Sequence, residues 1–281
     1  MRLFAKNTPS LSGQVNCPGD KSISQRAIII GALANQNISI SGFLNGEDPL
    51  STLSALNQIG ADISINDNRV NIKKREIPFS NSSNSIDLGN SGTGMRLMMG
   101  LIAGIGLKAK LIGDESLMKR PMSRVSIPLN EMGANISNSD GLPPIEIKSR
   151  EIRGDYFYDM PIASAQVKSS ILLAGVASNA KVSIFEPSIT RDHTELMLKH
   201  FGLNIKSEEE DDGKRITFTP GNNFLVQDYF VVGDFSSAAF LIIAGLIAND
   251  SAISIKNVGL NKTRIGFYEL LKKYGAKINF K

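Results

Sequence analysis

The chain has 281 residues, of which 42% are hydrophobic and 21% charged, and its formal net charge is +4. These values are ordinary for a globular protein that buries sizeable cores and can form two domains. The scattered charge gives no indication of a nucleic-acid surface, and no apolar run is long enough to span a membrane. The N-terminus has no hydrophobic signal segment, and the single Cys17 excludes an internal disulfide framework. We therefore expect a cytoplasmic protein.

The first stretch of the chain predicts helices and strands in alternation. Asp48 is expected to cap a helix that starts with Pro49 and ends at Gly60. The other elements predicted in this stretch are a helix over 22–34 and strands over 37–43, 62–65 and 69–73.

The later stretches repeat this order. An apolar helix begins at Ser91, and Pro128 is expected to kink the helix after it. Asp192 and Glu195 have the spacing of a capping box, and the acidic run over 208–212 is expected at a solvated hairpin tip. The remaining predicted elements are helices over 164–178, 234–248 and 263–274 and strands over 181–185, 252–256 and 276–280.

A recurring phrase, Leu-x-x-x-Gly-x-x-Ile, closes each stretch. Its glycines recur about every 70 residues, at Gly60, Gly133, Gly202 and Gly275. A period of this length indicates a repeated supersecondary unit. We expect residues 21–226 to form one domain of three units, with a boundary near 220–223. The fourth unit, which lacks the last strand of the others, would begin a second domain.

Four predicted helix starts are small, hydroxyl-bearing or rich in glycine, which suits anion binding at free N–H groups. These starts lie at residues 19–22, 89–94, 163–166 and 233–237. Cations accompany three of them: Lys21 and Arg26; Arg96, Arg120 and Arg124; Lys168 and Arg191. Arg96 and Lys168 interrupt apolar helices, so each is expected to have an anionic partner. Any one of these cations fits a structural ion pair equally well. Together they indicate a cleft for a small molecule with several negative charges.

Other chemistries find little support in the sequence. Residues 19–22 lack the earlier glycine of a phosphate-binding P-loop, and His193 and His200 lack further ligands for zinc. Cys17 has no histidine partner in the sequence and is expected to pack in a core. We expect no metal and no cofactor.

Five separated motifs resemble the EPSP synthase family of enolpyruvyl transferases, in order and over essentially the whole chain. They are Pro18-Gly-Asp-Lys-Ser-Ile-Ser-Gln-Arg26, Leu88-Gly-Asn-Ser-Gly-Thr-Gly-Met-Arg96, Lys119-Arg-Pro-Met122, Ser164-Ala-Gln-Val-Lys168 and Thr190-Arg-Asp-His-Thr-Glu195. The resemblance implies an α/β (α+β) fold of six βαβαββ units in two domains, an inside-out α/β barrel. With four units, the chain looks truncated at its C-terminus. The resemblance implies that residues 1–20 and 227–281 belong to an incomplete second domain.

The resemblance also implies a site and a reaction. The family transfers the enolpyruvyl group of phosphoenolpyruvate to the 5-hydroxyl of shikimate 3-phosphate. Lys21 would be catalytic and would contact both substrates. The residues implied for shikimate 3-phosphate are Lys21, Ser22, Arg26, Ser164, Ala165, Gln166, Lys168 and Arg191. Those implied for phosphoenolpyruvate are Lys21, Asn90, Gly92, Thr93, Arg96, Arg120 and Gln166.

Several expectations complete this interpretation. The family's acidic catalytic residue and its Lys-Glu-x-x-Arg motif have no counterpart here, so we expect no turnover by this chain alone. Gly92 leaves room for glyphosate, which occupies the phosphoenolpyruvate site in the family. The partners are expected to be the two small substrates, without nucleic acid or membrane, and the full enzyme a monomer. Two alternatives stay open: the related transferase that acts on UDP-N-acetylglucosamine, and a binding module without catalysis.

Overall fold

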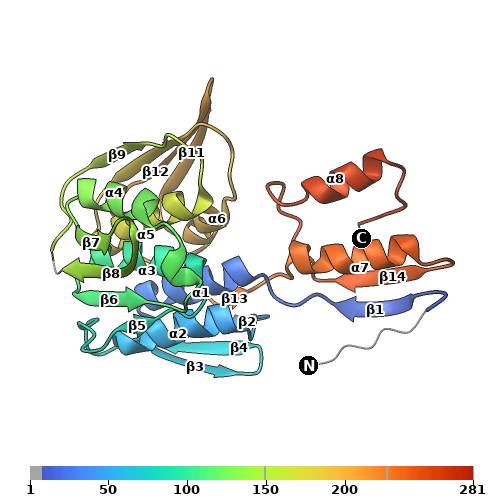
Figure 1. The fold of residues 1–281 in the computed structure, drawn as a ribbon, viewed down its shortest axis with the longest axis horizontal. Helices are drawn as coiled ribbons and strands as arrows, with labels where there is room; N and C mark the ends of the chain where they lie inside the picture. The colour runs from blue at the N-terminus through green and yellow to red at the C-terminus, as the bar shows by residue number, and fades with distance from the viewer. Residues whose placement is uncertain (1–7, 149, 226, 281) are drawn as a thin grey trace.

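The computed structural model describes residues 8–148, 150–225 and 227–280. The chain forms two parts that are joined by two extended segments (Figure 1). The larger part contains three similar units around one core. The smaller part contains β1 (Ser12–Asn16), α7 (Phe235–Ile247), β14 (Ala252–Lys256) and α8 (Gly266–Lys273).

The second and third units follow one order of elements, β-α-β-α-β-β. The second consists of β5 (Ile86–Asp87), α3 (Gly92–Ile105), β6 (Ala109–Ile112), α4 (Ser123–Glu131), β7 (Asn135–Ser139) and β8 (Leu142–Lys148), with a short 3-10 helix η1 (Leu117–Lys119) before α4. The third consists of β9 (Tyr156–Asp159), α5 (Ala165–Ser178), β10 (Val182–Glu186), α6 (His193–His200), β11 (Ile205–Glu210) and β12 (Gly213–Phe218). Each unit forms one four-stranded sheet, in which a parallel pair is followed by two antiparallel pairings.

The first unit takes its first strand from a distant part of the chain. It contains α1 (Lys21–Ala34), β2 (Ile38–Ser41), α2 (Glu47–Gln58), β3 (Asp62–Asn66) and β4 (Arg69–Lys73). The parallel partner of β2 is β13 (Tyr229–Phe230), which follows the third unit. In the smaller part, β1 is likewise the parallel partner of β14. The two parts therefore exchange strands.

The predicted α/β fold with repeated βαβαββ units is confirmed. Sheet pairing places β13 with the first unit and β1 with the smaller part, and the domain division at residue 226 stays a prediction. The two connecting segments pair with each other, since Asp20 N donates to Val232 O and Asp234 N donates to Pro18 O, each at 2.8 Å.

Helices α1, α3 and α5 form the centre of the larger part, with the three sheets around them (Figure 1). Nearly all of their side chains are buried. Helices α3 and α5 cross closely at two glycines. A methyl group at Gly100 would lie 2.2 Å from Ser170 O, and one at Gly104 would lie 2.5 Å from Ala174 O. The close crossing therefore requires glycine at both positions and fixes the relative placement of the two helix starts.

Several local predictions differ from the structure. Asp48 lies inside the first turn of α2, whose N-cap is Gly46, because the carboxylate of Asp48 pairs with Lys21 instead. Asp192 makes no side-chain capping bond, and Glu195 turns into the core. Residues 276–280 form no strand. By contrast, the acidic run lies at an exposed hairpin tip and Cys17 is buried, as predicted. Pro128 lies inside α4. Among the described residues, no helix is long and apolar enough to cross a membrane.

Candidate active site

The first turns of α1, α3 and α5 are joined by side-chain hydrogen bonds. Gln25 Nε2 of α1 donates to Ser91 Oγ, the N-cap of α3, at 2.6 Å. Gln166 Nε2 of α5 donates to Thr93 Oγ1 of α3 at 2.9 Å. Free N–H groups and the helix dipole make each of these ends favourable for an anion. The predicted convergence of the three helix starts is therefore present.

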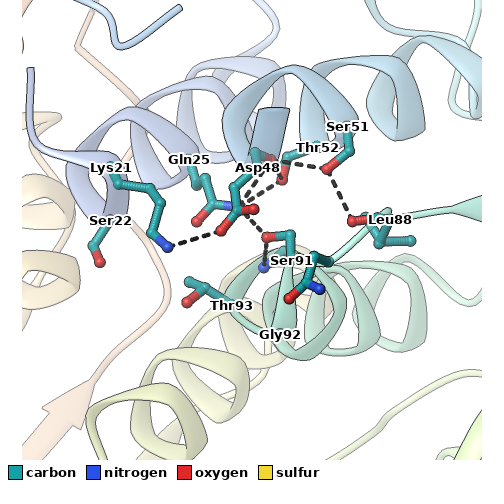
Figure 2. A network of polar contacts seen from close by, with 12 residues as sticks. Lys21, Ser22, Gln25, Asp48, Ser51, Thr52, Leu88, Ser91, Gly92 and Thr93 are labelled. Atoms are coloured by element: carbon teal, nitrogen blue, oxygen red, sulfur yellow. Dashed lines mark hydrogen bonds and ion pairs between the residues drawn. The ribbon is translucent and has the colours of Figure 1, made fainter. Parts of the chain in front are cut away.

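Lys21 extends from the start of α1 toward α2, above the start of α3 (Figure 2). Its Nζ lies 2.8 Å from Asp48 Oδ2, and its side chain is 50% exposed. The same network holds Gln25, whose Nε2 also donates to Thr52 Oγ1 at 2.9 Å. Asp48 thus gives the Lys21 ammonium a fixed counterion while leaving it accessible to solvent.

Three arginines gather beside the start of α3. Arg96 Nη1 donates to Gln166 Oε1 at 2.7 Å, and its Nη2 donates to Pro121 O at 3.0 Å. Burial lowers the pKa of Arg96, and the charges of Arg120 and Arg124 lower it further. Within the described residues none of the three pairs with a carboxylate, so the anionic partner that we expected for Arg96 is not found in the protein. An unpaired group of this kind suits an anionic ligand.

Arg120 is held in place by Asn90. Its Nη1 donates to Asn90 O at 3.2 Å, and its Nη2 donates to the side-chain oxygen of Asn90. Asn90 Nδ2 in turn donates to Asp114 Oδ2 at 2.6 Å. The backbone N–H of Leu117, which donates to Asp114, is the main reason why the pKa of that carboxyl is lowered. Asn90 therefore orients the guanidinium of Arg120.

Gly92 lies directly beneath two of these guanidinium groups. A methyl group at this position would lie 3.1 Å from Arg96 Nη1 and 3.2 Å from Arg120 Nη1. Glycine at the first residue of α3 thus keeps the space between the two side chains open.

Ser22, Arg26 and Arg191 form a second group at the start of α1. Arg191 Nη1 lies 3.5 Å from Ser22 Oγ. Arg26 is 3% exposed, and its Nε donates to Thr194 Oγ1 at 2.7 Å while its Nη2 donates to Ser169 Oγ at 2.9 Å. Burial, and then the charge of Arg191, lower the pKa of Arg26 to about 10. Arg26 donates its hydrogen bonds to protein groups and contributes positive charge from below the surface.

Lys168 requires a correction. It is completely buried, with Nζ 2.8 Å from Glu186 Oε2 and 2.7 Å from Glu195 Oε1. The predicted phosphate contact of Lys168 does not fit this position, because two carboxylates already surround the ammonium group and no solvent reaches it. The anionic partner expected for Lys168 is present as these glutamates.

The start of α5 supplies the remaining predicted residues. Ser164 is the N-cap, and its Oγ accepts from Val167 N at 3.5 Å. Ala165 is buried and can offer a ligand only its backbone N–H. Gln166 bridges α5 to α3, as described above.

Sequence reasoning overlooked the polar residues that hold this site together. They are Gln25, Asp48, Asp114, Ser169, Glu186, Thr194 and Glu195. A signal was available for Gln25 and Ser169, which interrupt the apolar helices α1 and α5. Asp114 lies in a loop, and its contact with Asn90 spans 24 residues, so nothing in the sequence pattern indicated it. Groups of three or more histidine, cysteine or acidic residues arranged to hold a metal are absent from the part of the chain that the structure describes.

Comparison with known proteins gives consistent matches. The model of the family described as EPSP synthase (3-phosphoshikimate 1-carboxyvinyltransferase) matches residues 6–281. A 3-phosphoshikimate 1-carboxyvinyltransferase of Shouchella clausii is 42% identical over 282 aligned positions, which take in 99% of this chain and 64% of the relative. One from Streptococcus pyogenes is 43% identical over 98% of this chain and 64% of the relative.

A solved structure of EPSP synthase from Acinetobacter baumannii superposes with a TM-score of 0.86 at 39% identity, covering 95% of this chain and 60% of that one. The chain thus spans less than two-thirds, at most 64%, of the length of these relatives.

Proposed function

Because the chain belongs to the EPSP synthase family, we propose that it supplies a 3-phosphoshikimate 1-carboxyvinyltransferase with its shikimate 3-phosphate site and part of its phosphoenolpyruvate site. The whole reaction would transfer the enolpyruvyl group to the 5-hydroxyl of shikimate 3-phosphate and release phosphate. We further propose a cytoplasmic protein whose partners are these two small molecules, without metal or cofactor, and a full enzyme that is a monomer.

One observation carries this proposal: three helix starts and a group of arginines without carboxylate partners meet at one place. The two substrates bring two phosphates and two carboxylates into one pocket, which requires this concentration of fixed positive charge. Guanidinium groups suit both kinds of anion because they bind carboxylate and phosphate through paired hydrogen bonds.

Each of the two groups of residues would bind one of the two substrates. Ser22, Arg191 and the start of α5 would hold shikimate 3-phosphate, with Arg26 adding charge from below. The group formed by Gly92, Arg96 and Arg120 would hold phosphoenolpyruvate.

Lys21 lies between the two groups and is the candidate for proton transfer. In the reaction, the hydroxyl oxygen loses its proton and bonds to C2 of phosphoenolpyruvate while C3 takes up a proton. C3 then loses a proton as phosphate leaves C2, which restores the double bond. The ion pair with Asp48 fixes the position of the Lys21 side chain.

Calorimetric titration of the 281-residue chain tests the proposal. We expect shikimate 3-phosphate to bind and unphosphorylated shikimate to bind far more weakly. Arg191→Ala should weaken binding of the phosphorylated ligand. Binding of UDP-N-acetylglucosamine in place of shikimate 3-phosphate would overturn the proposal in favour of the related transferase. Equal affinities for shikimate 3-phosphate and shikimate would contradict the proposed phosphate site.

A further inference from the structure

A buried charge triad, formed by Lys168, Glu186 and Glu195, lies behind the proposed shikimate 3-phosphate site. The exposed fractions of the three residues are 0%, 0% and 2%. Lys168 Nζ donates to Glu186 Oε1 at 2.9 Å. It lies 2.7 Å from Glu195 Oε1, where the alignment is that of a charge contact and not of a hydrogen bond. One ammonium group thus serves two carboxylates.

Burying such a triad in a core has a high free-energy cost. Removing three charged groups from water costs several kcal/mol per ion, and well-packed apolar residues often serve stability as well or better. Burial raises the pKa of Glu195, and the nearby Lys168 opposes this rise. The energetic cost suggests that the triad does something besides filling space, which directs attention to what it holds.

The triad is bonded to one wall of the site. Thr190 Oγ1 donates to Glu186 Oε2 at 2.8 Å, and Thr190 directly precedes Arg191. Lys168 and Glu195 are the chain neighbours of Ser169 and Thr194, the two hydroxyls that accept from Arg26. The three members come from α5, the end of β10 and α6. The triad therefore joins the two elements that flank Arg191 with the helices that carry the hydroxyl partners of Arg26.

We propose that the triad is a positioning device: through Glu186 and Thr190 it fixes the backbone at Arg191, so that this guanidinium stays beside the start of α1. This inference rests on the proposed function. Thr190 and the triad are positioning residues, since they act through Arg191 and do not contact the ligand.

The electrostatic surroundings of Arg191 explain why a tether is needed. Burial and the charge of Arg264 lower the pKa of Arg191, and the charge of Arg191 in turn lowers the pKa of Arg26. Two other arginines thus repel this side chain, and the charges of Asp20 and Asp234, which attract it, act from beyond ion-pair distance. In the described part of the chain no carboxylate lies within ion-pair distance of it. The segment before it is exposed over residues 187–189. Without the Thr190 bond, repulsion would move Arg191 toward solvent.

Thr190→Val tests the inference because it removes the hydroxyl and leaves the triad, Arg191 and the shape of the side chain in place. In the 281-residue chain we expect the Kd for shikimate 3-phosphate to rise about tenfold, the size of effect typical for a hydrogen bond to a charged group. The matched control is Thr217→Val, which removes a hydroxyl bonded to Ser183 Oγ at 3.0 Å in the same domain, away from the site. Its Kd should be unchanged.

A double-mutant cycle separates positioning from general loosening. If Thr190 acts through Arg191, Thr190→Val should add little in an Arg191→Ala background. A full tenfold effect in that background, or equal effects of Thr190→Val and Thr217→Val, would overturn the inference. Failure of Arg191→Ala itself to weaken binding, or no binding by the unmodified chain, would overturn the proposed function and this inference with it. Hydrogen exchange of the unliganded protein gives a second readout: Thr190→Val should speed exchange over 187–191, and unchanged exchange there would also contradict the inference.

Discussion

Helices α3 and α7 have similar sequences in outline but very different surroundings. Both begin at a serine or aspartate cap and continue as almost uninterrupted apolar runs. Most of α3 is buried, whereas α7 buries only Phe235 and Ala238 among its residues. Phe240 and Ile247 are 81% and 77% exposed. The same kind of helix is thus a core element in one part of the molecule and an open apolar face in the other.

The difference shows what the repeated unit requires. In the larger part, three units pack their first helices against one another, and each helix gains neighbours on every side. In the smaller part, α7 packs against β14, and α8 is the one other helix that the described residues place there (Figure 1). An apolar sequence alone does not make a core, because burial depends on the neighbouring units.

The largest expected loss of stability follows from removing a charge that is buried in the core of the larger part. Lys168→Met leaves two carboxylates buried without their cation, and we expect a loss of about 3–5 kcal/mol in the free energy of unfolding. Urea denaturation followed by circular dichroism measures it. The matched control is Lys272→Met on α8, where no residue is buried, and it should change little. Equal effects in the two variants would contradict the buried-triad interpretation.

A matched pair of isoleucines tests the comparison directly. Ile102→Ala in α3 should cost about 3 kcal/mol, because the side chain is fully buried and its removal leaves a cavity. Ile247→Ala in α7 should change stability by less than about 0.5 kcal/mol. Both values come from urea denaturation of the same chain. A large loss for Ile247→Ala would show that something covers α7 in solution.

The pH dependence of stability should reveal His193, which lies where the larger part meets the connecting segments. Burial, and then the charge of Arg26, lower its pKa to about 4. The charges of Arg264 and Arg191 also contribute to this lowering of the pKa, and the charge of Asp192 opposes it. The unfolded chain binds the proton at higher pH than the folded chain, so stability is lost as pH falls through the interval between about 6.5 and 4.

We expect a loss of roughly 1.5 kcal/mol from this histidine between about pH 6.5 and pH 5. His193→Gln should remove that part of the slope, measured as urea midpoints across the pH range. His200→Gln, at the exposed end of the same helix, is the control and should keep the slope. A slope unchanged in His193→Gln would contradict the assigned cause.

The smallest effect on stability, and a selective one on binding, is expected at Gly92. The methyl of Gly92→Ala must displace two arginine side chains by a few tenths of an ångström, which flexible ends permit. Stability should therefore change by less than about 1 kcal/mol, while binding of phosphoenolpyruvate or glyphosate beside shikimate 3-phosphate weakens about tenfold. Gly266→Ala is the control, because Gly266 also begins a helix and nothing lies within 4 Å of an added methyl. Equal affinities in both variants would refute the steric argument.

The sequence predicted the repeat and its elements well because each unit carries its own signals. Apolar periodicity, capping residues and the recurring glycine are local, and they define α1, α3 and α5 to within a residue or two. The pairing of β13 with β2 could not be predicted, since β13 has 2 residues and its partner strand lies nearly two hundred residues earlier. The prediction of a strand over 276–280 was wrong, because this segment has no partner strand among the described residues.

The site was predicted by charge type but not by exposure. Arg120 and Lys168 look alike as cations near helix starts, yet one is open and the other is enclosed by two glutamates. The difference depends on Glu186 and Glu195, which approach from other elements. The position of a residue in the sequence does not show such contacts, so only the folded structure separates cations enclosed by carboxylates from cations that are not.

The exchange of strands also has a consequence for how the protein is made. The first sheet cannot be completed until β13 has been synthesised, although β2 emerges nearly two hundred residues earlier. At about 5–20 residues per second, that wait is on the order of ten seconds or more. During it, the parallel edge of β2 has no partner strand, an edge that can pair wrongly with another chain. The order in which the ribosome releases the chain therefore leaves this edge open until β13 pairs with it.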